Sequence, residues 1–291
     1  MSRIFSAELF KIMKGKALRV NLLINIGFAL FYAFVVVFAI NSDMDMMGME
    51  NMFPGDGVAA IGSSFIIFWQ IIVICAAVLA GIWVCDEFDN GTIRNVLSKG
   101  VSRTKFYVSK LVSVYVVSLV FTVISVIILF ATITIAFTVG STETLDVTNL
   151  LLFFAGQFLI YLTYVSLFVM MAFLFRNVGA TLGVGIAFPV LIELLFVSLL
   201  SMSFAEPVSF LANIFPQYNI AQFNDVFNAG IGGEIVTYGR EYVYELGAYI
   251  PVVEETASAL NTYLVAAAVS FATVVITTVV GIYTFNKRDV K

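Results

Sequence analysis

The stretch DEFDNGTIRNVLSKGVSRTKFYVSK, residues 86–110, is the polar interval around which this sequence is organised. It joins two long apolar blocks, residues 61–85 and 106–139. Each block is long enough to cross a bilayer as a helix, which takes about 20 residues. Strands of a membrane barrel would appear as short alternating segments instead, and the sequence has none. The arrangement predicts a chain that leaves the membrane after one helix, turns, and re-enters it as the next.

The rest of the chain extends this pattern. Of its 291 residues, 61% are hydrophobic and only 12% are charged, whereas a soluble domain carries about a quarter charged residues. Four further apolar blocks lie at residues 21–40, 150–175, 179–203 and 262–285. We therefore expect an all-α polytopic membrane protein with six transmembrane helices, forming one transmembrane domain over residues 1–291.

Local signals divide the 86–110 interval into a turn, a short helix and a second turn. Asp89-Asn90-Gly91 is a turn sequence. Thr92 is a candidate N-cap for a short helix over residues 93–98, which Gly100 ends. Ser102 is placed to cap the helix that continues into the next apolar block. A short helix at the membrane edge predicts a docking element.

The distribution of basic residues predicts the orientation. Every Lys and Arg except Arg240 lies before the first block, in the 86–110 interval, at Arg176, or after the last block. Short loops rich in Lys and Arg stay in the cytoplasm, so both termini and the 86–110 interval are expected there, and the opposite face is strongly acidic. A cleaved signal peptide is the alternative for the N-terminus, but about 20 amphipathic residues precede the first apolar block.

Those first residues, 2–20, have the pattern of an interfacial helix. Apolar side chains recur at helical spacing while charged ones fall elsewhere on the wheel; the apolar set is Ile4, Phe5, Leu9, Ile12 and Met13. Such a helix lies in the headgroup plane with its lysines near anionic lipid. The alternative is a basic flank without fixed structure.

Other segments narrow the class of protein. The chain has no His, and both cysteines, Cys75 and Cys85, lie in one apolar block, so we expect core thiols and no metal site. No phosphate-binding loop is present, and Gly15-Lys16 lacks its upstream glycine. The long interval 204–261 is expected to form an external region, in which the apolar run 210–215 suits an interfacial or re-entrant helix.

Glu193 is the carboxylate that lies well inside an apolar block. An acid there costs about 2.5–3.5 kcal/mol on insertion scales, so it should face protein or a water path. One hypothesis is that Glu193 lines a dimer interface or a transport route. The other is that it is protonated and hydrogen-bonded to a neighbour such as Gln157.

The interval resembles the signature of ABC-2 type transporter permeases. The residues that carry the resemblance are Glu87-Phe88-Asp89-Asn90-Gly91-Thr92, Ile93-Arg94-Asn95-Val96-Leu97-Ser98, Val101-Ser102-Arg103 and Lys110-Leu111. The interfacial helix of residues 2–20, which we call the elbow helix, also matches this family. So do the six spans and the long external region before the last span. The chain departs from it at Gly100, where many members have proline.

This resemblance implies a transport subunit that is not itself an enzyme. Such permeases form homo- or heterodimers and work with cytoplasmic ABC ATPase subunits, which bind the ATP and Mg. The helix Thr92–Ser98 would be the coupling helix, and its ATPase-coupling residues would be Glu87, Gly91, Thr92, Ile93, Arg94 and Leu97. The alternative for the two charged residues is that Glu87 and Arg94 merely neutralise each other at the membrane edge.

The cargo is indicated by two features. Ala7-Glu8-Leu9-Phe10-Lys11 followed by Lys14-Gly15-Lys16 is similar to permeases of the bacitracin and lantibiotic self-protection group. An acidic external face would also concentrate a cationic peptide. The leading hypothesis is a bacterial plasma-membrane exporter or extractor of a peptide antibiotic or another amphipathic, drug-like compound. Membrane lipids are expected partners and nucleic acid is not. The alternative function is a secondary transporter driven by an ion gradient through Glu193.

Overall fold

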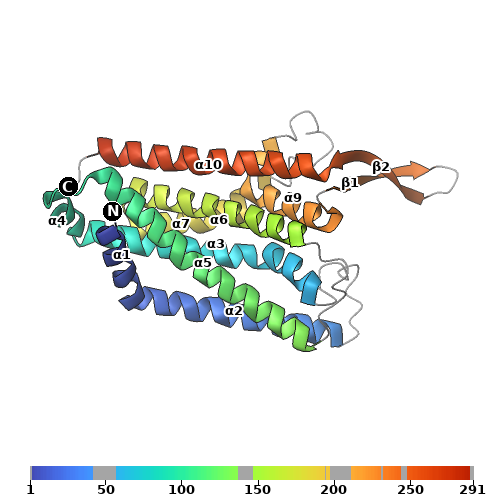
Figure 1. The fold of residues 1–291 in the computed structure, drawn as a ribbon, viewed down its shortest axis with the longest axis horizontal. Coiled ribbons are helices and arrows are strands. Elements are labelled where there is room, and N and C mark those ends of the chain that lie inside the picture. Colours follow the sequence, from blue (N-terminus) through green and yellow to red (C-terminus); the bar gives the residue numbers. More distant parts are fainter. Residues whose placement is uncertain are drawn as a thin grey trace.

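A computed structural model describes residues 2–41, 57–136, 147–193, 195–196, 211–230, 232–243 and 248–288. Long helices lie side by side in an elongated bundle (Figure 1). In chain order the elements are α1 (Ser2–Lys14), α2 (Lys16–Asn41), α3 (Gly57–Asp89), α4 (Thr92–Ser98), α5 (Arg103–Ala136), α6 (Val147–Phe175), α7 (Val178–Ala187), the π-helix η3 (Phe188–Glu193), α9 (Pro216–Ala229), β1 (Glu234–Val243), β2 (Ala248–Ser258) and α10 (Ala259–Lys287).

The predicted spans correspond to helices of the bundle. Within the described residues, three helical segments are long and apolar enough to cross a membrane: Arg103–Thr132, Val147–Phe175 and Ala259–Lys287. Helices α2 and α3, with 26 and 33 residues, also exceed the length that a span needs. The elbow is shorter than predicted, because the chain breaks at Gly15 and residues 16–20 already belong to α2.

The fifth predicted span, residues 179–203, is not one regular α-helix. Helix α7 covers 10 residues and then widens into the π-helix η3. Pro189 lies at this change and lacks the N–H that a regular α-helix would use there. Glu193 ends η3. Residues 197–203 lie outside the described residues.

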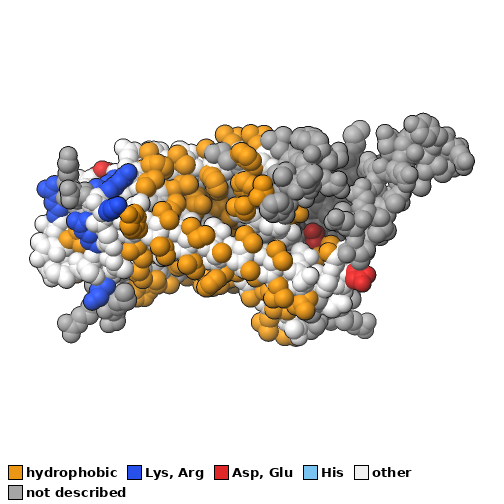
Figure 2. Space-filling view, turned by 90° about the horizontal axis from the view of Figure 1, so that it is seen from above, with side chains coloured by type: hydrophobic (Ala, Val, Ile, Leu, Met, Phe, Trp, Pro, Cys, Tyr) orange, Lys and Arg blue, Asp and Glu red, His pale blue; other side chains and the backbone are white. Residues whose placement is uncertain are grey.

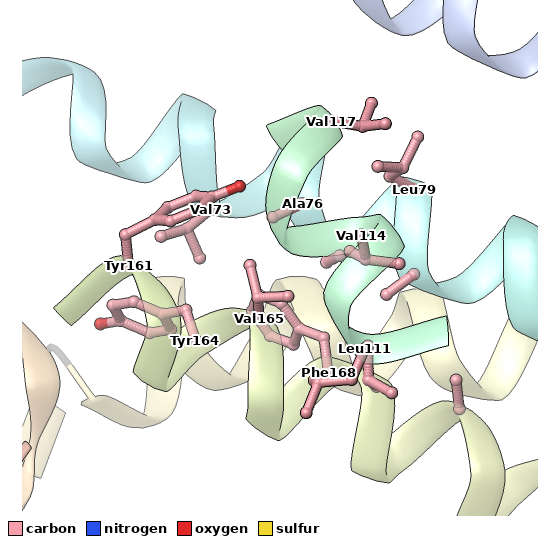
Figure 3. Packing of buried hydrophobic residues seen from close by; sticks show 14 of the residues in the cluster. Val73, Ala76, Leu79, Leu111, Val114, Val117, Tyr161, Tyr164, Val165 and Phe168 are labelled. Carbon is pink, nitrogen blue, oxygen red and sulfur yellow. The ribbon is translucent and has the colours of Figure 1, made fainter. Parts of the chain in front are cut away.

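Helix α6 is the centre of the bundle. Of its most apolar window, 56% is buried, against 29% for the window in α5 and 22% for that in α10. Figure 3 shows side chains of three helices meeting around it. These buried residues come from α3 (Val73, Ala76, Leu79), from α5 (Leu111, Val114, Val117) and from α6 (Tyr161, Tyr164, Val165, Phe168).

Polar side chains tie the apolar helices together. The Asn21 amide donates to the Cys75 carbonyl at 2.9 Å, which joins α2 to α3. Thr277 donates to the Ser166 hydroxyl at 2.8 Å, and Thr163 donates to the Ser270 carbonyl at 3.2 Å; both bonds join α6 to α10. Small hydroxyl residues at such contacts let helices approach closely while satisfying buried polar groups.

The region between the last two predicted spans, residues 204–261, is partly built into the bundle where the structure describes it. Pro216 starts α9, a position that suits proline because its missing N–H is not needed there. Helix α9 packs on α6 so closely that a Cβ on Gly156 would lie 2.7 Å from the Phe223 ring. The short 3₁₀ turn at 211–214 precedes it.

The prediction of an all-α fold is wrong in this region. Strands β1 and β2 form an antiparallel hairpin, with Glu234 opposite Ser258 and Val243 opposite Ala248. A bulge occurs between Thr237 and Tyr238. Both strands are rich in β-branched and aromatic residues, which favour strands. The hairpin projects from one end of the bundle, opposite the end where α4 and both termini lie (Figure 1).

The side chains on the surface of the bundle show which solvent surrounds it. Large apolar side chains are exposed along the outer helices, among them Phe31, Ile127, Ile135 and Val279 at 58–85%. Figure 2 shows them as a broad hydrophobic band, with Lys and Arg gathered at one end. Soluble proteins rarely expose such a surface. The chain is a membrane protein with several membrane-crossing helices, and we refer to the end with the gathered Lys and Arg as the basic end.

A tight contact between α5 and α10 gives a first testable prediction. A Cβ on Gly281 would overlap the Tyr107 hydroxyl and lie 2.8 Å from its ring carbon Cε2, and Tyr107 is fully buried. Gly281→Ala should therefore lower the free energy of unfolding in mixed micelles by about 1–3 kcal/mol. Gly27→Ala, with nothing within 4 Å of its Cβ, is the control; it lies inside α2, so it should leave stability unchanged or raise it by up to about 1 kcal/mol. Equal unfolding free energies for the two variants would contradict the packing described.

Candidate functional site

Helix α4 at the basic end is bounded by two glycines in left-handed conformations. Gly91, its N-cap residue, has φ 64°, and Gly100 has φ 84°. A proline at position 100 could not adopt this angle, so the departure of this sequence from the family pattern comes with a differently shaped turn. Both glycines are therefore required by the backbone that presents α4.

Thr92 does not have the role predicted for it. It is the first residue of α4 and not the N-cap, and its hydroxyl donates to the Glu87 carbonyl at 3.2 Å. This bond ties the start of α4 to the end of α3. The prediction for Ser102 is confirmed, because its hydroxyl accepts from the Lys105 N–H at 3.3 Å in the first turn of α5.

Helix α4 has one face on the bundle and one face outward. Ile93 is 1% exposed, and Val96 and Leu97 pack against the same core. The outward positions are exposed and polar; they are Arg94, Asn95, Ser98 and Lys99. Of the predicted coupling residues, Ile93 and Leu97 hold the helix in place and Arg94 faces outward.

Beneath α4 lies a buried charge cluster formed by Glu8, Lys11, Glu87 and Lys110. The Lys110 ammonium is fully buried, 2.6 Å from Glu8 Oε2 and 2.9 Å from Glu87 Oε1. The Lys11 ammonium is half exposed, 3.1 Å from Glu87 Oε1 and 3.6 Å from Glu8 Oε1. Two carboxylates and two ammonium groups thus compensate one another, and they join α1, α3 and α5.

The two carboxylates beside Lys11 favour its charged state. Burial alone would lower the pKa of Lys11, but the carboxylates of Glu87 and Glu8 outweigh it and the pKa is raised. Lys11 therefore remains protonated at neutral pH and beyond. Lys110 also lies 4.4 Å from the centre of the Trp83 ring, a cation–π contact.

The cluster changes the interpretation of Glu87. The alternative that Glu87 and Arg94 neutralise each other is wrong, because the ion pairs of Glu87 are with Lys11 and Lys110, whereas Arg94 is exposed on α4. The side chain of Glu87 thus belongs to the cluster and its carbonyl accepts from Thr92. One residue connects α4 to the elbow helix α1 and to α5.

The elbow helix also differs from its predicted wheel. Glu8, assigned to the polar side, is 3% exposed, whereas Met13, assigned to the apolar side, is 69% exposed. Ile12 is buried as predicted, at 1%. The helix turns Glu8 inward because Lys110 offers an ion pair there.

Two arginine side chains donate hydrogen bonds to backbone carbonyls at the helix ends near this site. Arg103 Nη1 donates to the carbonyls of Phe285, Asn286 and Arg288 at 2.9–3.2 Å, which caps the end of α10 from the start of α5. Arg288 in turn donates to the Leu174 carbonyl at 2.7 Å. These bonds satisfy carbonyls that a helix end leaves open, and they join α5, α6 and α10.

The remaining residues singled out in the sequence lie at several places in the bundle, or their side chains lie outside the described residues. Gln157 is 5% exposed in the interior of α6. The side chain of Glu193 lies outside the described residues, so its suggested bond to Gln157 is not tested. Cys75 and Cys85 are buried free thiols. Arg176 lies with its guanidinium carbon 5.2 Å from the centre of the Phe88 ring.

Sequence reasoning missed the cluster. The sequence pattern places Lys110 in a motif and Glu8 and Lys11 on the polar side of the first helix, and it does not indicate that these residues contact one another. The available signal was Lys110 itself, the charged residue within the predicted apolar block 106–139. Such a residue requires an acidic partner, and the nearest candidates are at the ends of the neighbouring apolar segments.

Residues 4–192 match the family described as ABC-2 family transporter protein. The match covers more than half of the 291 residues. It takes in the elbow helix, α4 and all four members of the charge cluster. Helix α9, the hairpin and α10 lie outside it. No curated protein matches the sequence.

The cluster yields a stability prediction. Lys110→Met leaves the carboxylates of Glu8 and Glu87 buried with only the half-exposed Lys11 as partner, so it should destabilise the fold by about 3–5 kcal/mol. The double variant Glu87→Gln/Lys110→Met restores neutrality and should recover much of this loss. Unfolding in mixed micelles measures both.

Lys105→Met, an exposed lysine near the start of the same helix, is the matched control and should change stability by less than about 0.5 kcal/mol. If Lys110→Met were no worse than Lys105→Met, the cluster would not hold the three helices together.

Proposed function

We infer the function from one premise: the chain belongs to the ABC-2 family of transporter proteins. It is the non-catalytic, membrane-spanning permease component of an ABC-2 transporter, and permeases of this family work with ATPase subunits.

The ATPase docks on α4. This helix is short, fixed at both ends by left-handed glycines, anchored by Ile93 and polar on its outward face. It lies at the basic end, where Figure 2 places the gathered Lys and Arg. We assign Arg94 as the principal polar contact, because it is the exposed cation within the helix.

The basic end is cytoplasmic in this proposal. The concentration of Lys and Arg at one end of a membrane protein is the usual mark of that side. Both termini lie at this end (Figure 1). Five basic residues also fall within the 86–110 interval that contains α4, namely Arg94, Lys99, Arg103, Lys105 and Lys110. ATP and Mg bind to the partner subunit, which approaches from the same side.

Movement of the ATPase passes through Glu87. A displacement of α4 acts on Glu87 through the Thr92 hydroxyl bond, and Glu87 holds Lys11 of α1 and Lys110 of α5. Because the pair between Glu87 and Lys110 is buried, its rupture is costly. The single observation that carries this proposal is that Glu87 belongs to the buried charge cluster and also accepts a hydrogen bond from the first residue of α4.

The substrate class is an amphipathic compound, with a peptide antibiotic as the leading case. It is supported by the resemblance of residues 7–16 to the bacitracin and lantibiotic group and by the acidity of the sequence segments at the opposite side. A second permease copy or a paralogue completes the transporter. The family membership leaves the ion-driven alternative without a supporting observation.

The docking proposal predicts that Arg94→Glu separates the permease from its ATPase. Tagged protein purified from membranes of cells that naturally make it should bring down Mg-dependent ATP hydrolysis. Because this chain has no phosphate-binding loop, any such hydrolysis belongs to a partner. Arg94→Glu should remove most of the co-purifying activity while the permease stays folded.

Lys105→Glu makes the same change of charge at an exposed position outside α4, and it should retain the activity. Loss of activity in both variants would point to a general charge effect and not to docking on α4. Retention in both would reject α4 as the docking element.

A further inference from the structure

The carbonyls at the end of α10 are bound by a side chain of another helix. A helix leaves its last four carbonyls without a partner of its own. In α10 the carbonyls of Phe285 and Asn286 accept from Arg103 Nη1 at 3.2 and 2.9 Å. The carbonyl of Arg288, just beyond the helix, accepts from the same nitrogen at 2.9 Å. Lys287, in the last turn of α10, lies over an aromatic ring of its own helix, 4.9 Å from the ring centre. The cation at the negative end of the α10 dipole is therefore Arg103.

Arg103 lies directly after the docking helix. It is the first residue of α5, and residues 99–102 separate it from the end of α4. Gly100 gives this turn its left-handed backbone, and its N–H donates to the Leu97 carbonyl of α4 at 3.0 Å. Figure 1 shows α4, the start of α5 and the end of α10 at the same end of the bundle. A displacement of α4 therefore reaches Arg103 through a short turn that is itself hydrogen-bonded to α4.

Helix α10 has no part in the charge cluster. The cluster joins α1, α3 and α5, whereas α10 packs on α6, α9 and α5. At the basic end the ring of Phe285 lies 4.8 Å from that of Phe173 in α6, centre to centre. Apolar contacts are non-directional, so they keep α10 in the bundle without fixing its position along its axis. The bonds of Arg103 are directional, and the Asn286 amide adds a longer one to the Thr104 hydroxyl at 3.4 Å.

We propose that Arg103 is a positioning residue that makes α10 follow the movement of α4. When the ATPase displaces α4, the start of α5 moves with it, and Arg103 carries the end of α10 along. Glu87 acts on α1 and α5, and Arg103 acts on α10. The bond from Arg288 to the Leu174 carbonyl extends the movement to α6. This inference rests on the proposed docking of the ATPase on α4.

The test is a distance measurement across the bundle by pulsed electron paramagnetic resonance. Spin labels are placed at Leu23→Cys and Val279→Cys, exposed positions of α2 and α10, which lie on opposite sides of the bundle (Figure 1). The complex with the ATPase is purified from cells that naturally make it, with an excess of unlabelled permease, so that only distances within one chain are recorded. Trapping with ATP, Mg and orthovanadate should shift the mean distance by about 2 Å.

Variants at position 103 separate positioning from a general effect on structure. Arg103→Met removes every donor and should abolish the shift, while the co-purifying ATP hydrolysis stays because α4 is intact. Arg103→Lys keeps a cation with three N–H donors and should retain most of the shift. Lys105→Met, at an exposed position of the same turn of α5, is the matched control and should retain all of it. If Arg103→Met does not fold, Arg103→Gln replaces it and should lose most of the shift with the charge.

The inference is overturned if the unaltered protein shows no shift, or if the shift persists in Arg103→Met. Equal losses in Arg103→Met and Arg103→Lys, or in Arg103→Met and Lys105→Met, would also overturn it. Loss of ATP hydrolysis in Arg103→Met would place Arg103 in the docking surface and not in the link to α10. Docking itself is judged by Arg94→Glu: retention of hydrolysis in that variant would reject α4 as the docking element, and this inference with it.

Discussion

The buried ammonium group of Lys110 is the constraint on which the basic end of this protein depends. It lies fully out of solvent between the carboxylates of Glu8 and Glu87. Removing such charges from water costs several kcal/mol for each ion, which close pairing must offset. The elbow helix, the end of α3 and the start of α5 therefore cannot separate independently, because moving any one of them exposes an unpaired charge to an apolar environment.

The ion pairs of Lys110 help to position helix α4, a surface helix that contributes few contacts of its own. Helix α4 has seven residues, too few to be stable in isolation. It is held by Ile93 in the core, by the Thr92 bond to Glu87 and by the glycine turns on each side. The arginine bonds that cap α10 and reach α6 close the same end of the bundle. A permease driven by a separate ATPase requires a rigid end of this kind, because a displacement of α4 by the ATPase must reach the membrane helices.

Hydrophobic block lengths and the positions of glycine were sufficient to predict the long helices and the short helix after Gly91, and the resemblance of residues 87–111 to ABC-2 permeases indicated the family. The missed features depend on contacts between distant segments. Glu8 was placed on the wrong side of its helix because its partner, Lys110, is more than a hundred residues away. The hairpin was missed although its strands are rich in Val, Ile and Tyr, because residues 204–261 were expected to form an external region with an interfacial or re-entrant helix at 210–215. Pro189 was visible in the sequence, but its local effect, a π-helix, depends on packing against neighbours.

The most direct test of the link between the charge cluster and α4 is a distance measurement by pulsed electron paramagnetic resonance. Spin labels at Met13→Cys and Asn95→Cys report the separation of α1 and α4, and the native cysteines are buried. With the cluster intact the distance distribution should be narrow. Glu8→Gln, which breaks the ion pair between α1 and α5, should broaden it. A distribution that stays narrow in Glu8→Gln would contradict the view that the cluster positions α1 relative to α4.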